Sequence, residues 1–188
     1  MPSQIGPAFL YVLPCLGEDL LKLGFSRDPL ARARALHGRY FEFFDIDEAY
    51  LIELGDAREA RAMERARAQA LRAHRAPMPM SINAEAGGHT EWYRGAYEYL
   101  HSYNAALEAA GHAVHRLRPW LRQRLVQQSD VLYSWAMLLS EAELAARGAE
   151  ARRTPAQRHV GDLLDAYVAV GLDPGQWLPE PVMAWQRG

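Results

Sequence analysis

The sequence contains almost no lysine: among its 21 lysine and arginine residues, Lys22 is the only lysine. It also has a single cysteine, Cys15, which excludes an internal disulfide and a cysteine-based metal cluster. No apolar run is long enough to span a membrane, and residues 1–14 lack the basic start and long apolar core of a signal peptide. We therefore expect a cytoplasmic protein that has no membrane attachment.

Neither sign of charge dominates, because the net charge of −2 gives no chain-wide basic surface of the kind that many nucleic-acid-binding proteins have. The charges are nevertheless segregated: every charged residue in 41–57 is acidic, whereas 58–75 and 111–128 are rich in arginine. Such runs often form solvated helix faces, but a local basic surface can also bind a phosphate backbone. The residues expected to contact nucleic acid are Arg34, Arg65, Arg122 and Arg124.

The first half of the chain has the pattern of an α+β domain. Runs rich in aromatic and aliphatic residues at 8–14, 20–25 and 48–54 predict three strands, the first two as an antiparallel hairpin. Helices are predicted where an N-cap residue precedes a helix-forming stretch and a glycine or a change of pattern ends it. These helices cover approximately 29–38, 56–74 and 91–111.

Beyond residue 111 the pattern is helical, with helices expected near 113–127, 130–147 and 155–171, an exposed connector at 147–155 and an irregular proline-rich tail. We divide the chain into a domain of residues 1–110 and a helical C-terminal extension of residues 111–188. The extension is a candidate for binding a protein partner, and the sequence does not define the oligomeric state.

The hairpin and the helix after it carry short strings in a distinctive order. Phe9-Leu10-Tyr11 lies on the first strand, Lys22-Leu23-Gly24 lies on the second, and Arg32 follows eight residues after Gly24. Glu64 lies on the long helix, and Glu91-Trp92-Tyr93 follows it. This order, over roughly residues 8–100, resembles the GIY-YIG nuclease superfamily, in the phage-type branch with Lys-Ile-Gly in place of Tyr-Ile-Gly. The resemblance implies a small antiparallel or mixed three-stranded sheet flanked by helices.

The resemblance also implies a metal-dependent DNA endonuclease, a hydrolase of bacterial or phage origin that uses Mg²⁺ or Mn²⁺. Glu64 would bind the metal, with Glu59 on the same helix as a rival. Arg32 would stabilise charge on the phosphate, and Tyr11 would take the proton of the attacking water. Lys22 would contact a phosphate oxygen or orient the water.

Three positions depart from what nuclease relatives often carry, and the first is Phe9, which stands in place of the first glycine of the Gly-Ile-Tyr string. Leu36, four residues after the arginine, stands where a histidine or tyrosine is frequent, and Ala68, four residues after the glutamate, stands where a histidine is frequent. A second interpretation therefore stays open: a nucleic-acid-binding or regulatory module of the same fold with weakened catalysis. The choice between DNA and RNA is not decided by the sequence.

Overall fold

The computed structural model describes residues 6–146 and 152–187, so the connector predicted at 147–155 lies mostly outside the described residues. The chain forms two compact units, Met1–Arg118 and Pro119–Gly188. The first unit combines a sheet with helices, as the α+β prediction required, and the described part of the second unit is helical.

An antiparallel sheet of five strands organises the first unit, with the strand order β4-β2-β1-β3-β5. Its strands are β1 (Ala8–Pro14), β2 (Leu21–Ser26), β3 (Tyr50–Leu54), β4 (Trp92–Tyr93) and β5 (Val114–Arg116). The central strand β1 pairs with both β2 and β3, and its Tyr11 lies opposite Gly24 on one side and Leu51 on the other. Directly opposed residues point to the same face of a sheet, so Tyr11, Lys22 and Gly24 share one face.

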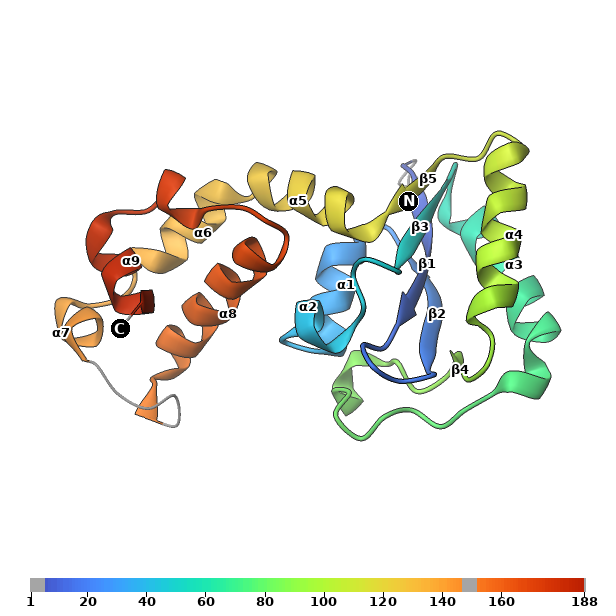
Figure 1. The fold of residues 1–188 in the computed structure, drawn as a ribbon, viewed down its shortest axis with the longest axis horizontal. Coiled ribbons are helices and arrows are strands. Elements are labelled where there is room, and N and C mark those ends of the chain that lie inside the picture. Colours follow the sequence, from blue (N-terminus) through green and yellow to red (C-terminus); the bar gives the residue numbers. More distant parts are fainter. Residues whose placement is uncertain (1–5, 147–151, 188) are drawn as a thin grey trace, which may run out of the picture. The chain divides into compact units, whose positions relative to one another are not determined.

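Helices cover both faces of this sheet (Figure 1). The helices on the face of Tyr11 are α1 (Pro29–Leu36) and α2 (Tyr40–Phe43), and those on the other face are α3 (Ala57–Ala70) and α4 (Tyr97–Ala109). Alternate residues of β1, β2 and β3 pack with Ala60 of α3 and Leu100 of α4 in one apolar core. Because both faces are covered, the side chains from Ala8 to Leu13 are all buried.

Local side-chain caps set the starts of the two helices that matter most for the site. The carboxylate of Asp28 accepts a hydrogen bond from Ala31 N at 3.0 Å, and Pro29 occupies the first helical turn of α1. Asp56 caps α3 in the same way by accepting from Glu59 N at 2.8 Å. The carboxylate of Glu59 in turn accepts from Gly55 N at 2.9 Å, which ties this side chain to the helix start.

The expectation of a three-stranded sheet is wrong, because two further strands pair with its edges. Trp92 and Tyr93 were expected to begin a helix, but they pair with β2. The residues that flank this pair, Glu91 and Gly95, have positive φ angles of 60° and 63°, which a right-handed helix does not allow. Helix α4 therefore starts only at Tyr97. Residues 114–116, expected to be helical, pair instead with the free edge of β3.

The described part of the second unit is built from helices alone. They are α5 (Leu117–Gln127), which begins in the first unit, α6 (Ser129–Ala136), α7 (Glu141–Ala145), α8 (Pro155–Ala169) and α9 (Glu180–Arg187). The helix expected at 130–147 is two helices, because Ser140 starts a new one with a capping box to Glu143. The tail, expected to be irregular, contains α9, which buries Val182, Met183 and Trp185.

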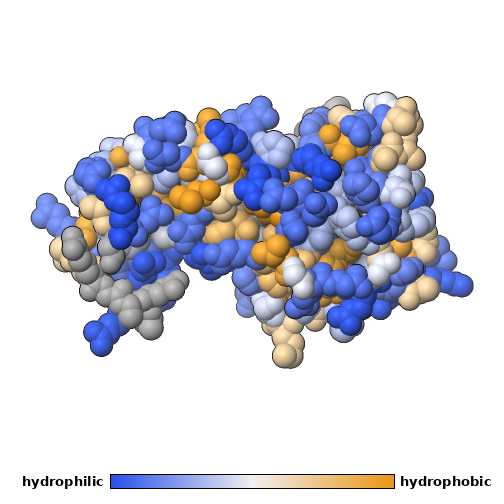
Figure 2. Space-filling model, in the orientation of Figure 1, coloured by the Kyte–Doolittle hydropathy of each residue, from blue (hydrophilic) through white to orange (hydrophobic). Residues whose placement is uncertain are grey.

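Short 3₁₀ turns complete the described elements, at Arg72–His74, Ala84–Ala86 and Pro174–Gln176. Hydrophobic side chains reach the surface among hydrophilic ones (Figure 2). Most of the large exposed ones belong to the second unit, including Val131, Tyr133 and Leu138. Among the described residues, no helix combines the length and the apolar character that crossing a membrane requires.

Candidate active site

Tyr11 and Arg32, which come from β1 and α1, meet on one face of the sheet. The Nε atom of Arg32 donates a hydrogen bond to the hydroxyl oxygen of Tyr11 at 3.2 Å. The tyrosine ring lies against the backbone of Gly24 on the neighbouring strand, because a Cβ atom there would be 2.2 Å from the tyrosine hydroxyl. Only glycine leaves this space, so the residue opposite Tyr11 determines where its hydroxyl lies.

The loop before β4 holds the rest of the Arg32 guanidinium. Nη1 donates to the carbonyl oxygen of Ala86, and Nη2 donates to that of Gly87 at 3.4 Å. The next carbonyl, that of Gly88, accepts from the indole Nε1 of Trp92 at 2.6 Å. Three successive carbonyls of the loop are therefore used, two to orient Arg32 and one to anchor the loop to β4.

Lys22 is buried in the sheet, with 2 % of its surface exposed. Its Nζ atom donates to the carbonyl oxygen of Leu23 at 2.6 Å and lies 3.5 Å from Oε2 of Glu91. Burial lowers the pKa of Lys22 to about 8, and the charge of Arg32 acts in the same direction, while the carboxylates of Glu91 and Glu64 oppose the change. The single lysine of the chain is thus an ammonium group whose charge changes close to neutral pH.

Glu64 projects from α3, the helix on the opposite face of the sheet from α1, and it is half-buried. Burial and the nearby charge of Glu91 raise the pKa of its carboxyl group, and Lys22 partly offsets this. The charge of Glu64 also acts on the hydroxyl of Tyr11. Its rival Glu59 is exposed and accepts the hydrogen bond from Gly55 at the start of α3.

Tyr11 is as buried as Lys22, with 2 % of its surface exposed. Burial raises the pKa of its phenol, although the hydrogen bond and charge of Arg32 pull it down. At neutral pH the phenol therefore keeps its proton. The hydroxyl of Tyr11 accepts the hydrogen bond from Arg32, and its role toward an attacking water stays a prediction.

The four arginines expected to contact nucleic acid are divided between the two units. Arg65 is exposed on α3, one residue beyond Glu64, and Arg34 is half-buried on α1. Arg122 donates to the carbonyl of Gly171 at 2.5 Å, just beyond the end of α8. Arg124 donates to Gln127 at 3.2 Å, and its guanidinium lies over the ring of Trp120. Arg122 and Arg124 thus both take part in contacts within the helical unit.

Sequence comparison identifies the domain that contains this cluster. A sequence model of the T5orf172 domain matches residues 8–110, which is more than half of the chain. The chain belongs to the T5orf172 domain family. This family is a phage-associated, nuclease-like domain, which associates the chain with nucleic acids. No curated protein and no solved structure matches the chain.

The match corrects the resemblance to the GIY-YIG superfamily, because T5orf172 is a different family. The strings that carried the resemblance, Phe9-Leu10-Tyr11 and Lys22-Leu23-Gly24, are three residues long. A buried hairpin of apolar and aromatic residues can contain such strings in many folds, so they do not identify one family. The T5orf172 match covers β1, β2, β3 and β4 and continues through α4, ending before β5.

Within the T5orf172 domain, sequence reasoning missed the contribution of the loop before β4. The sequence singles out Glu91 only as the first residue of Glu91-Trp92-Tyr93, whereas in the structure its carboxylate is the ion-pair partner of Lys22. The carbonyls of Ala86 and Gly87 were not identifiable as Arg32 acceptors, since main-chain oxygens leave no mark in a sequence. The two glycines that follow Ala86 were the one available signal of a tight main-chain approach.

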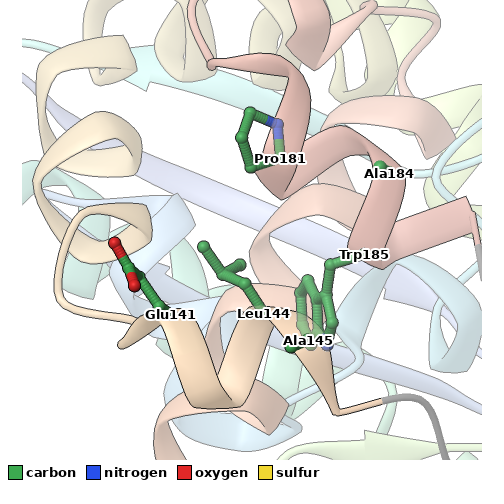
Figure 3. Close-up of a pocket in the computed structure, with 6 residues that line it drawn as sticks. All are labelled: Glu141, Leu144, Ala145, Pro181, Ala184 and Trp185. Atoms are coloured by element: carbon green, nitrogen blue, oxygen red, sulfur yellow. The ribbon is translucent and has the colours of Figure 1, made fainter.

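A separate concavity of about 330 Å³ lies in the helical unit, between α7 and α9 (Figure 3). Leu144 and Ala145 of α7 face Pro181, Ala184 and Trp185 of α9 there, with Glu141 at the edge. The described residues that line it include no cation that could bind a phosphate. We therefore place the candidate active site in the T5orf172 domain, around Tyr11, Lys22, Arg32 and Glu64.

Proposed function

We propose that this T5orf172 domain is a metal-dependent endonuclease that hydrolyses phosphodiester bonds in DNA. The observation that carries the proposal is the contact between Arg32 and Tyr11, formed beside a buried ammonium and a half-buried carboxylate. A guanidinium with defined geometry can bind two oxygens of a phosphate at once. The nuclease-like character of the family agrees with this chemistry.

In the proposed reaction, Arg32 stabilises the negative charge that develops on the non-bridging phosphate oxygens. Its orientation comes from the Tyr11 hydroxyl and the carbonyls of the loop before β4, so little reorganisation is needed when DNA binds. The ammonium of Lys22 adds positive charge on the same face of the sheet. Tyr11 keeps its proton and contributes hydrogen bonds that orient Arg32 and the attacking water. As the water oxygen bonds to phosphorus, the bond from phosphorus to the leaving sugar oxygen breaks. The proton that the water loses passes to bulk solvent, from which the leaving oxygen takes one.

Glu64 is the residue that we propose holds Mg²⁺ or Mn²⁺. Among the described residues, no group of three or more His, Cys, Asp or Glu side chains could bind a metal ion. A single carboxylate still fits magnesium, which usually keeps several waters and binds through one or two carboxylates and substrate phosphates. When bound, the metal would polarise the phosphate and stabilise the leaving oxygen. We expect it to bind well only together with DNA.

DNA would bind through arginines near this site. Arg61 and Arg65 are both exposed and lie on either side of Glu64 along α3, and their charges act on its carboxyl group. Contacts of this kind release counterions, so affinity should fall steeply with salt. Arg122 and Arg124 of the helical unit stay predictions as DNA contacts; Nη1 of Arg122 donates to the carbonyl groups of Val170 and Gly171.

The burial of Tyr11 and Lys22 favours a second candidate, a DNA-binding or regulatory module with little turnover. A plasmid-nicking assay with Mg²⁺ or Mn²⁺, with and without a chelator, separates the two. The endonuclease proposal predicts nicking that requires the metal and is lost with the chelator. Salt-sensitive DNA binding without nicking under either metal would support the module instead. A role of the C-terminal unit in binding a protein partner stays a prediction.

A further inference from the structure

A buried ammonium group needs a fixed counter-charge, and Lys22 has one. An isolated charge inside a protein is strongly unfavourable unless it is paired and hydrogen-bonded. The Nζ atom of Lys22 satisfies this condition with the Leu23 carbonyl at 2.6 Å and the Glu91 carboxylate at 3.5 Å. Glu91 is the more exposed partner, since 31 % of its side chain is accessible against 3 % for Lys22.

The backbone of Glu91 has an unusual conformation. Among the described residues, it is the only non-glycine residue with a positive φ, at 60°. This left-handed region is unfavourable for a residue with a Cβ atom, and such residues persist where the surrounding structure fixes them. Here the Glu91 carbonyl accepts from Leu23 N at 3.0 Å, while Thr90 Oγ1 donates to the Glu91 carboxylate.

Glu91 therefore contacts two adjacent residues of β2, Lys22 and Leu23. Its main chain binds Leu23, and its side chain turns back to the ammonium of Lys22. An extended backbone at this position would point the side chain elsewhere, so the strained conformation is what brings the carboxylate to Lys22.

We propose that Glu91 is a positioning residue of the active site, whose carboxylate holds the ammonium of Lys22 in place and maintains its charge. The inference rests on the proposed endonuclease activity, in which that ammonium contributes positive charge near the phosphate. Glu91 acts through Lys22 and is not assigned as a metal ligand. The match to the T5orf172 domain assigns no role to this residue.

The charged groups around Lys22 determine how its pKa should change when the carboxylate of Glu91 is removed. Arg32 on α1 disfavours the ammonium, while Glu64 on α3 and Glu91 before β4 favour it. Tyr11 on β1 belongs to the same set, because its hydroxyl interacts with Arg32, Glu64 and Glu91. Removing the charge of Glu91 leaves Glu64 as the one carboxylate of this set that favours the ammonium, against burial and the charge of Arg32. The pKa of Lys22 must then fall below its value of about 8.

The chain offers a direct test, because Lys22 is its only lysine. Protein labelled with ¹³C at the lysine ε-carbon gives one lysine NMR signal, which reports this ammonium without a cleavage assay. We expect the signal to titrate near pH 8 in the wild type and about one pH unit lower in Glu91→Gln. The matched control is Glu85→Gln, an exposed glutamate in the same loop, which should leave the titration unchanged.

Cleavage is measured on the same three proteins from pH 6 to pH 9.5, as kcat/KM, which reports groups of the free enzyme. The wild-type value should fall as the pH rises through about 8, when Lys22 loses its proton. In Glu91→Gln the fall should come about one unit earlier, giving about fivefold lower kcat/KM at pH 8 and little change at pH 6. Glu91→Asp, which keeps the charge, should restore part of the difference.

The outcomes separate this inference from the activity on which it rests. A wild-type lysine signal that titrates at its ordinary pKa, or the same midpoint in Glu91→Gln, would overturn the role of Glu91. A shifted midpoint with an unshifted cleavage profile would also overturn it, while leaving the endonuclease intact. If the wild type cleaves nothing, the proposed function fails, and the NMR titration still decides whether Glu91 holds Lys22. If Glu91→Gln does not fold, the wild-type titration and Glu91→Asp decide.

Discussion

Gly24 shows how a single missing side chain shapes the candidate site. It lies opposite Tyr11 in the sheet, and a Cβ atom at this position would lie 2.2 Å from the tyrosine hydroxyl and 2.5 Å from the ring carbon that carries it. Tyr11 has no space to move aside, because only 2 % of its surface is exposed. The hydrogen bond from Arg32 therefore depends on the absence of a side chain at Gly24.

Gly24→Ala is expected to displace Tyr11 and break its hydrogen bond with Arg32. We expect a loss of about 1–3 kcal/mol in the free energy of unfolding, as for overpacking in other cores. Cleavage should fall by about tenfold or more, because the guanidinium loses its fixed orientation. Urea unfolding and single-turnover cleavage measure the two effects. Gly38→Ala is the matched control, since no heavy atom lies within 4 Å of a Cβ atom there.

Sequence reasoning reached some of these residues and not others, for physical reasons. Alternation along the strands placed Tyr11 and Lys22 on one face, and the Asp28-Pro29 helix start placed Arg32 over it. The contact between Arg32 and Ala86 joins residues 54 positions apart through a carbonyl group. The left-handed backbone of Glu91 was equally hidden, because a glutamate at that position gives no sign of it.

Among the elements, the loop between α3 and β4 does the most to complete the site. It contributes the carbonyls that bind Arg32 and the carboxylate that binds Lys22. Trp92 anchors this loop by donating from its buried indole to the carbonyl of Gly88 at 2.6 Å. Prediction of this stretch as a loop followed by a helix was reasonable from composition, yet it missed the two-residue strand that makes the anchor.

Trp92→Phe removes the indole donor and leaves the Gly88 carbonyl without that partner. We expect a loss of about 1–3 kcal/mol of stability from the unsatisfied carbonyl, together with weaker cleavage because the loop no longer orients Arg32. Chemical denaturation and cleavage rates at saturating DNA report these effects. Trp177→Phe makes the same substitution at a half-buried tryptophan of the helical unit, far from the loop in sequence, and it should leave cleavage unchanged. Equal losses in both variants would contradict the anchoring role.

At the scale of the whole molecule, the position of the domain boundary has a structural consequence. The first compact unit ends at Arg118, whereas the pattern of the sequence suggested residue 110. The intervening residues include β5, which pairs with β3, and Leu117, whose amide donates to Ala49 at 2.9 Å. Arg118 also forms an ion pair with Asp47. All of these contacts lie within the first unit.

A protein of residues 1–118 is therefore expected to unfold cooperatively, and a protein of residues 1–110 is expected to be less stable. The shorter protein loses the strand that pairs with β3, the buried side chain of Leu117 and the Arg118 ion pair. We expect a difference on the order of 2 kcal/mol or more from the lost hydrogen bonds and buried area. Thermal unfolding followed by circular dichroism provides the comparison. Equal melting temperatures would show that β5 adds nothing to the first unit.

The central claim is that the chain cleaves DNA with a metal held by Glu64, and the pair Glu64 and Glu59 gives the sharpest comparison. Both glutamates lie on α3, but Glu59 is engaged at the helix start, where a glutamine could still accept the Gly55 hydrogen bond. Glu64 is half-buried and acts electrostatically on Lys22 and Tyr11. The same substitution therefore removes a proposed metal ligand in one case and only a surface charge in the other.

The decisive measurement is single-turnover plasmid cleavage with Mg²⁺ or Mn²⁺ by wild type, Glu64→Gln and Glu59→Gln, with DNA affinity measured in parallel. We predict that Glu64→Gln loses cleavage by on the order of 100-fold or more while still binding DNA, because removal of a negative charge does not weaken phosphate contacts. Glu59→Gln should cleave like the wild type. Undiminished cleavage by Glu64→Gln would contradict the account.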